Sequence, residues 1–148
     1  MKKYISVLLF IFAFQMIAVS QNFNRLSQLI STDEISYAQA AYIAAIYTGD
    51  VTENTDEKTA FEVLKQKGFV PEKINMDSKI TIADLCSLFA KVTDVRGGIM
   101  FMISKKSPHY AFREFVVKKY IPQGLNPSAK VRGSDAIGLF NSLTEETK

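Results

Sequence analysis

Two stretches that match without a gap decide the fold: AFEVLKQKGFVPEKINMDSKITIADLCSLFAKVTD (residues 60–94) and AFREFVVKKYIPQGLNPSAKVRGSDAIGLFNSLTE (residues 111–145). A shift of 51 residues superimposes them, and ten of the 35 paired positions are identical. The identical pairs are Ala60/Ala111, Phe61/Phe112, Lys67/Lys118, Pro71/Pro122, Asn75/Asn126, Lys79/Lys130, Asp84/Asp135, Leu88/Leu139, Phe89/Phe140 and Thr93/Thr144. Agreement at this density predicts two copies of one structural unit.

A third, shorter copy precedes these two. The stretch ISYAQAAYIAAIYTG lies 45 residues before its counterpart, so that Ile35 and Ser36 correspond to Ile80 and Thr81. Only the second half of the unit is present there. The chain therefore consists of about two and a half units, with copies over residues 35–49, 56–94 and 107–145.

Each complete unit is predicted to contain a short helix, a loop with a proline and a longer helix. In the second copy, helical spacing over residues 56–67 stops at Gly68, and apolar residues at i, i+3, i+4 and i+7 predict a long helix over residues 81–93. In the third copy, Ser107 and Pro108 suit the start of the short helix. The pattern predicts an all-α repeat bundle.

The long helices of the first and third copies complete this bundle. The one that starts at Ser36 is rich in alanine, which permits close approach of neighbouring helices, so we expect it to be the most central. The one that starts at Arg132 places its apolar residues on one side. None of these helices can bury its apolar stripe alone, and the units must pack together.

The N-terminus has the pattern of a secretory signal peptide. Lys2 and Lys3 precede an apolar stretch over residues 4–19, which ends in small residues before Gln21. We expect cleavage of residues 1–20, which leaves residues 21–148 as a single domain with no membrane span; a retained anchor is the alternative. The remaining 16 Lys and Arg against 15 Asp and Glu give no reason to expect a nucleic-acid partner.

Cysteine and histidine each occur once. Because Cys86 is the single cysteine of the sequence, it cannot form an intrachain disulfide. Its place on an apolar helix face indicates a small core residue. An intermolecular disulfide or a redox role is the alternative. His109 follows a proline at a helix start, where we expect it at the surface. The sequence therefore predicts no metal site, no cofactor and no catalytic activity.

The repeated unit resembles the S-layer homology (SLH) module over most of residues 35–143. Its long-helix start, ITIADLCSLFAKV, is similar to the family signature Thr-Arg-Ala-Glu: Thr81 and Ala83 are kept, Ile82 replaces arginine and Asp84 replaces glutamate. The resemblance implies a pseudo-threefold arrangement of the long helices. It also implies attachment to cell-wall polysaccharide through grooves between the units.

The arginine of this signature, which in the family helps to recognise an acidic sugar, is absent from every copy. Tyr37, Ile82 and Gly133 take its place. Of the basic residues near the motif, Arg132 and Lys130 are the best candidates for ligand contact, because an anion there can also use the free amides of a helix start.

Three further residues at the helix starts are candidates for the same ligand site, namely Thr81, Asp84 and Asp135. A structural role is the alternative for each. Thr81-x-x-Asp84 and Ser36-x-x-Gln39 approximate a capping box, and an acid in the first turn complements the helix dipole.

A longer link joins the second and third copies. It contains Ile99, Met100, Phe101, Met102 and Ile103 between two glycines and two lysines, within residues 96–107. One interpretation is a short strand or turn packed over the end of the bundle. The other is a partner surface, which methionine would make adaptable.

The sequence thus predicts an exported protein, periplasmic or associated with the cell envelope. We expect a non-catalytic structural or protein-interaction module whose partner is a cell-envelope protein. The alternative is a glycan-binding module for cell-wall polysaccharide or peptidoglycan.

Overall fold

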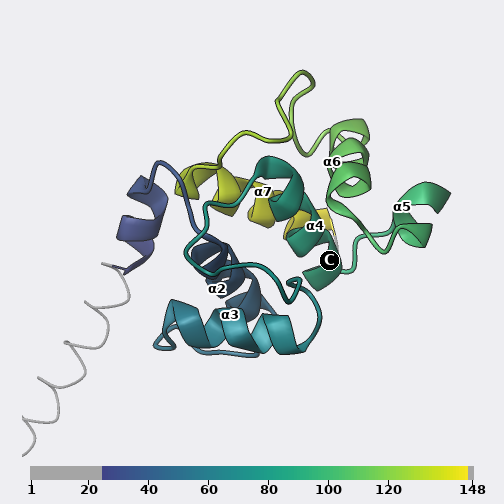
Figure 1. Ribbon diagram of the computed structural model, residues 1–148. Coiled ribbons are helices and arrows are strands. Elements are labelled where there is room, and N and C mark those ends of the chain that lie inside the picture. The colour runs from purple at the N-terminus through teal and green to yellow at the C-terminus, as the bar shows by residue number, and fades with distance from the viewer. Residues whose placement is uncertain (1–24, 147–148) are drawn as a thin grey trace, which may run out of the picture.

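The computed structural model describes residues 25–146, and every regular element among them is a helix (Figure 1). A helical segment over residues 25–31 comes first. It is followed by α2 (Tyr37–Tyr47), α3 (Glu57–Gln66), α4 (Ile82–Val92), α5 (Ile99–Ile103), α6 (Pro108–Val117) and α7 (Gly133–Glu146). The predicted all-α class is confirmed for this part of the chain. The predicted signal peptide lies outside the described residues.

The helix starts follow the capping signals of the sequence. Ser36 and Gln39 form a complete capping box at α2, with the Gln39 amide 3.2 Å from Ser36 Oγ and the Ser36 amide 2.9 Å from Gln39 Oε1. Thr81 caps α4 by accepting from the amide of Asp84. Ser107 precedes α6 but makes no cap bond through its side chain, and Pro108 supplies the first residue of that helix.

The alanine-rich helix α2 is buried along most of its length. Seven of its eleven residues are buried, and the helix packs against both α3 and α4 (Figure 1). Cys86 is 0% exposed on α4, in keeping with the prediction of a core residue. Small side chains on α2 favour this packing against α3 and α4.

The loops before α4 and α7 share a turn at positions 51 residues apart. Asn75 Oδ1 accepts a hydrogen bond from the Asp77 amide at 2.9 Å, and Asn126 Oδ1 accepts one from the Ser128 amide at 3.0 Å. An asparagine side chain that bonds the amide two residues ahead fixes a tight turn. This bond explains why asparagine occurs at both positions.

The paired lysines at the ends of these loops also make the same bond. Lys79 Nζ donates to the Glu34 carbonyl oxygen at 2.7 Å, and Lys130 Nζ donates to the Lys79 carbonyl oxygen at 2.9 Å. In both cases the acceptor lies immediately before the isoleucine, Ile35 or Ile80, that precedes the long helix of the preceding sequence copy. Each lysine therefore ties its own copy to the one before it.

The starts of the long helices lie together at one end of the bundle. The Ile80 amide donates to the Ile35 carbonyl oxygen at 3.1 Å, and the Ile35 amide donates to the Val131 carbonyl oxygen at 2.9 Å. All three side chains are buried. Residues at one position of the three sequence copies are thus joined through their backbones.

Aromatic packing joins α4 to α7 in the core. Phe89 is 0% exposed and Phe140 is 6% exposed, and their ring centroids lie 4.7 Å apart at an interplanar angle of 72°. This edge-to-face geometry is favourable beyond the area that it buries. The corresponding residue of α2, Ala44, is also fully buried.

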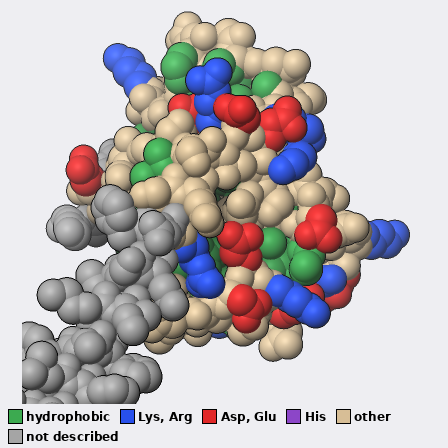
Figure 2. Space-filling model, turned by 90° about the vertical axis from the view of Figure 1, so that its left-hand side faces the viewer, with side chains coloured by type: hydrophobic (Ala, Val, Ile, Leu, Met, Phe, Trp, Pro, Cys, Tyr) green, Lys and Arg blue, Asp and Glu red, His purple; other side chains and the backbone are tan. Residues whose placement is uncertain are grey.

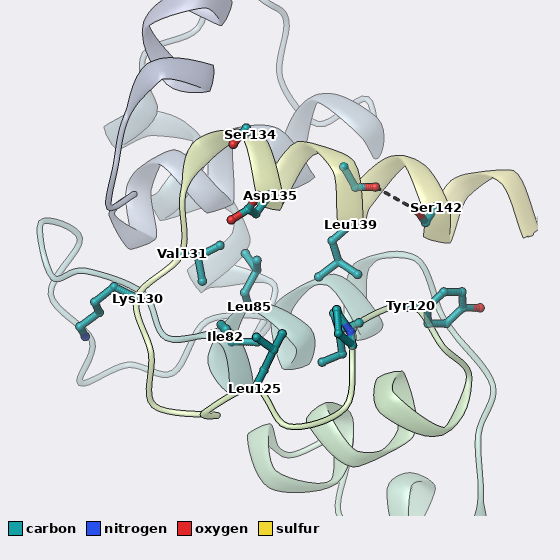
Figure 3. A pocket seen from close by; sticks show the side chains of 13 residues that line it. Ile82, Leu85, Tyr120, Leu125, Lys130, Val131, Ser134, Asp135, Leu139 and Ser142 are labelled. Atoms are coloured by element: carbon teal, nitrogen blue, oxygen red, sulfur yellow. Dashed lines mark hydrogen bonds between the residues drawn. The ribbon is translucent and has the colours of Figure 1, made fainter.

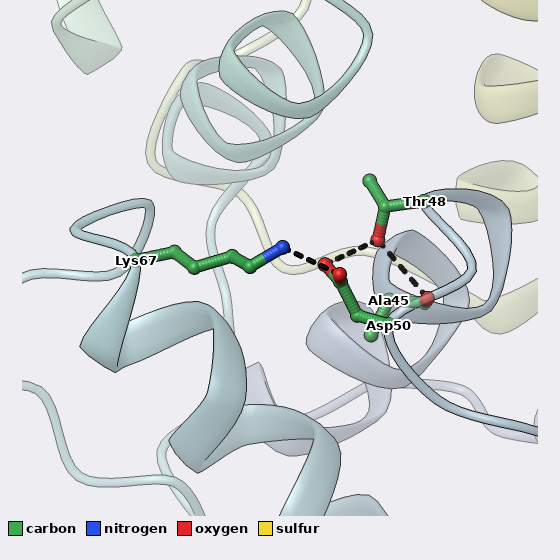
Figure 4. A network of polar contacts seen from close by, with 4 residues as sticks. All are labelled: Ala45, Thr48, Asp50 and Lys67. Carbon is green, nitrogen blue, oxygen red and sulfur yellow. Dashed lines mark hydrogen bonds and ion pairs between the residues drawn. The ribbon is translucent and has the colours of Figure 1, made fainter.

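A polar network joins the C-terminal ends of α2 and α3 (Figure 4). Lys67 forms an ion pair with Asp50, and the Thr48 hydroxyl lies 2.7 Å from Asp50 Oδ2 and 3.1 Å from the Ala45 carbonyl oxygen. Bonds from Lys67 and Thr48 hold the pKa of Asp50 below its ordinary value of 3.8. The network therefore stabilises the fold only while Asp50 is ionised.

The substitution Asp50→Asn should change how stability depends on pH. Because folding lowers the pKa of Asp50, its contribution is present above pH 3.8 and is lost as the pH falls through the lower pKa of the folded state. We expect the variant to be less stable at pH 7 by less than about 1 kcal/mol, since the pair is near the surface. Denaturant unfolding at about pH 7 and about pH 2 should show a smaller loss for the variant than for the native chain. Glu72→Gln, at an exposed position, is the control, and equal losses for all three proteins would contradict the expectation.

The link between α4 and α6 departs from the prediction of a strand or turn packed over the bundle end. Residues Ile99–Ile103 form the one-turn helix α5, and only Phe101 is buried. Ile99, Met100, Met102 and Ile103 are exposed. Phe101 thus anchors the helix while its other side chains face outward.

Candidate functional site

A pocket of about 460 Å³ lies between α4, the loop that precedes α7, and α7 itself (Figure 3). We call it the α4–α7 groove. Its lining consists of Ile82, Leu85, Tyr120, Ile121, Pro122, Leu125, Lys130, Val131, Ser134, Asp135, Gly138, Leu139 and Ser142. Apolar side chains therefore form most of its wall.

A second pocket of about 60 Å³ is formed by residues at matching sequence positions. We call it the α2–α4 groove, and its lining consists of Tyr37, Phe69, Val70, Pro71, Ile74, Asp84, Ser87, Leu88, Lys91 and Pro108. Eight of these residues lie 51 positions before a residue of the α4–α7 groove, and Tyr37 lies 45 positions before Ile82. Residues at matching sequence positions thus line both grooves, and the α4–α7 groove has much the larger volume.

Larger side chains account for the small volume of the α2–α4 groove. Ser87 and Lys91 stand there where the α4–α7 groove has Gly138 and Ser142. Lys91 is half-buried, its Nζ lies 3.4 Å from the Phe69 carbonyl oxygen, and burial lowers the pKa of its ammonium. A side chain that occupies a groove in this way leaves no room for a ligand.

Tyr37 closes the α2–α4 groove from the opposite side. Tyr37 pairs with Ile82 in the sequence comparison, is 7% exposed, and its hydroxyl hydrogen bonds to the Asp84 carboxylate. Burial, with the bond to Asp84 and its negative charge, raises the pKa of the Tyr37 hydroxyl well above its usual range. The phenol is therefore neutral, and Asp84 is engaged within the protein.

The open groove has a different chemical character. Leu85, Leu125 and Leu139 converge on its interior, whereas Lys130 extends away from it (Figure 3). Asp135 lies at its edge, exposed, and forms no hydrogen bond or ion pair with any described residue. The groove thus combines an apolar interior with one carboxylate that has no partner of its own.

Gly133, which pairs with Ile82 in the sequence comparison, lies beneath the segment 25–31. A Cβ atom on Gly133 would stand 1.7 Å from the Leu29 carbonyl oxygen, and the Gly133 amide donates to the Thr32 carbonyl oxygen at 2.9 Å. Leu29 itself is 2% exposed. The backbone of this segment therefore occupies the place where any residue other than glycine would put its side chain.

The five predicted ligand residues do not form one site. Lys130 and Asp135 line the α4–α7 groove, and Asp84 lines the α2–α4 groove. Arg132 is exposed but lines neither groove, and Thr81 caps α4. Four further residues line the α4–α7 groove without having been predicted from their motif, namely Tyr120 and Leu125 of the loop and Ser134 and Ser142 of α7. The signal that places the loop against α7 is the pairing of residues 118–131 with residues 67–80.

Residues with chemical reactivity are few. Burial raises the pKa of the Cys86 thiol to about 12, so the thiol is protonated at neutral pH. His109 is exposed. In residues 25–146 no three histidine, cysteine or acidic side chains lie close enough together to hold a metal ion, and no helix has the length and apolar character to cross a membrane.

Comparison with known proteins gave no match to any family model, to any curated protein or to any solved structure.

Proposed function

We propose that this protein is an exported, non-catalytic SLH-like domain of the cell envelope, and that it works as a protein-interaction module. The matching turns, lysine bonds and grooves support about two and a half repeated units in a pseudo-threefold arrangement. The observation that carries the function is the lining of the α4–α7 groove, which is apolar inside and has at its edge the Asp135 carboxylate, unpaired among the described residues.

The partner is a protein segment with an aliphatic side chain beside a lysine or arginine. Burying one leucine-sized side chain in the groove contributes about 1.5–3 kcal/mol. A cation of the partner near Asp135 adds up to about 1 kcal/mol and sets the orientation of the segment. An acidic sugar fits poorly, because Asp135 repels it, Lys130 extends away from the groove, and no arginine within residues 25–146 lines it.

Photo-cross-linking tests this proposal in the native envelope. A photoreactive phenylalanine analogue at Leu125, which is 39% exposed at the groove, should cross-link to a partner protein. The double variant Ile82→Tyr/Ser142→Lys gives the α4–α7 groove the residue types that stand at the matching positions, 37 and 91, of the α2–α4 groove. We expect it to lower the cross-link yield at least about tenfold, because the partner loses its apolar anchor.

Two further variants separate a specific partner from a chance neighbour. Asp135→Lys should also weaken the cross-link, whereas Tyr37→Phe, in the closed groove, should leave it unchanged. A cross-link that is indifferent to Asp135→Lys and to groove filling would contradict the proposal. Thermal unfolding of every variant establishes that the fold is intact.

A neutral cell-wall glycan is the second candidate. It is favoured by the position of the open groove, which lies between the second and third sequence copies, where the SLH resemblance implies a sugar site. Binding of the purified protein to cell-wall sacculi, with and without their polysaccharide, tests it. Sacculus binding that depends on the polysaccharide and is lost in Ile82→Tyr/Ser142→Lys would favour the glycan over a protein partner.

A further inference from the structure

The helix α5 presents an apolar surface that the bundle does not use. Ile99 is 79% exposed and Ile103 is 71% exposed, and the two methionines of the helix are at least half exposed. Val117 of α6, 75% exposed, lines a shared hollow with α5 and extends the surface. We call these residues, Ile99, Met100, Met102, Ile103 and Val117, the α5 patch.

The base of α5 is held firmly to the bundle. Phe101 is 2% exposed, and a Cβ atom on Gly97 would stand 2.5 Å from its ring. After the helix, Lys106 Nζ bonds the Ala90 carbonyl oxygen at 3.1 Å and Asp94 at 2.7 Å. The helix therefore projects from a fixed base, at the end of the molecule opposite the segment 25–31 (Figure 1).

Positive charge gathers in the same part of the chain. Residues 94–120 contain six Lys and Arg and two Asp and Glu, a net charge of +4, while the other described residues contain nine against thirteen, a net charge of −4. Arg96, Lys105, Arg113, Lys118 and Lys119 are all exposed. By contrast, the face at the left of Figure 1 carries side chains of both signs (Figure 2).

We propose that the α5 patch docks on the surface of an anionic phospholipid bilayer, independently of the α4–α7 groove. Interfacial binding usually combines two contacts. An apolar element enters the acyl boundary of the bilayer, and lysines and arginines beside it contact acidic headgroups. At about 100° per residue, the four exposed residues of α5 spread over nearly half of the helix circumference, on the side opposite Phe101. A protein groove would match a narrow stripe on a longer helix, whereas a bilayer surface can contact the whole exposed side of a projecting turn.

A tryptophan placed in the patch tests the docking directly. The chain contains no tryptophan, so Met100→Trp gives a single fluorophore on α5. With vesicles of phosphatidylethanolamine and phosphatidylglycerol we expect a blue shift of its emission and quenching by brominated acyl chains. Vesicles of phosphatidylcholine alone should bind it much more weakly. Because the probe lies on α5, insertion by an uncleaved N-terminal stretch would not produce these signals.

Variants of the α5 patch and of the exposed lysines that follow Val117 separate the apolar and the electrostatic contributions to vesicle binding. In the Met100→Trp background, Met102→Asp/Ile103→Asp should weaken vesicle binding at least about tenfold, and Lys118→Gln/Lys119→Gln should weaken it about tenfold or more. Leu26→Asp, at a 53% exposed leucine on the segment 25–31, is the matched control and should bind as the parent does. The aspartates of both variants stand at exposed positions, so the fold should be retained.

Three results would overturn the proposal. The first is an unshifted tryptophan on anionic vesicles, and the second is equal binding to phosphatidylcholine. The third is a protein cross-link from a photoreactive residue at Ile103 in cells, combined with no vesicle binding, which would assign the α5 patch to a protein partner instead.

Discussion

Phe89→Ala should lower the free energy of unfolding by about 3–5 kcal/mol, the usual cost of removing a buried phenylalanine. Phe89 is fully buried in α4 and its ring contacts Phe140 of α7 edge to face. The substitution leaves a cavity at the junction of the two complete sequence copies and also removes this aromatic contact. Because a domain of this size is stable by about 5–15 kcal/mol, the loss is a large fraction of the total.

Denaturant unfolding followed by circular dichroism measures this loss. Val117→Ala, at a 75% exposed position, removes a side chain outside the core and should change stability by less than about 0.5 kcal/mol. A Phe89→Ala loss below about 1 kcal/mol would mean that α4 and α7 do not share a packed core.

The helices were predictable because their signals are local. Ser36 and Thr81 stand at the N-caps of α2 and α4, and Pro108 opens α6, as the sequence indicates. The predicted ranges 56–67 and 81–93 differ from α3 and α4 by one residue at each end, which is the residue that caps the helix. Capping and apolar spacing depend on residues within four positions of each other, so one sequence suffices to read them.

The ligand site was not predictable in the same way. Asp84 and Asp135 stand at the same position of the second and third sequence copies. Asp84 nevertheless bonds Tyr37, whereas Asp135 has no partner among the described residues. The difference arises from what lies across each groove, Tyr37 in one case and Ile82 in the other. Contacts between copies depend on packing over 45 residues or more, which a motif within one copy does not encode.

Exposure of the α5 patch was also left open by the sequence. Five consecutive apolar residues suit a buried strand as well as a projecting helix. Met102 and Ile103 face outward because Phe101 alone fills the space beneath α5, and Lys106 ends the segment by bonding back to Ala90. The choice between a buried strand and a projecting helix therefore depends on long-range contacts, which this run of five residues does not encode.

An arginine should destabilise the fold far more at position 133 than at the paired position 82. Gly133→Arg places a side chain where the Leu29 carbonyl oxygen already lies, 1.7 Å from the ideal Cβ position. Backbone cannot move aside as a flexible side chain does, so we expect a loss of at least about 3 kcal/mol, at the upper end of overpacking costs. The hydrogen bond from the Gly133 amide to Thr32 is lost with it. Ile82→Arg, by contrast, projects into the open α4–α7 groove and should cost less than about 1.5 kcal/mol.

Two measurements distinguish displacement of the segment 25–31 from general unfolding. Hydrogen exchange followed by mass spectrometry should show lost protection over residues 25–34 in Gly133→Arg and native protection there in Ile82→Arg. Denaturant unfolding gives the change in total stability for both. Equal stability and equal protection in the two variants would mean that the segment does not rest on α7. The expected contrast would instead show that the segment 25–31 excludes a side chain at position 133, whereas position 82 in the α4–α7 groove accepts an arginine.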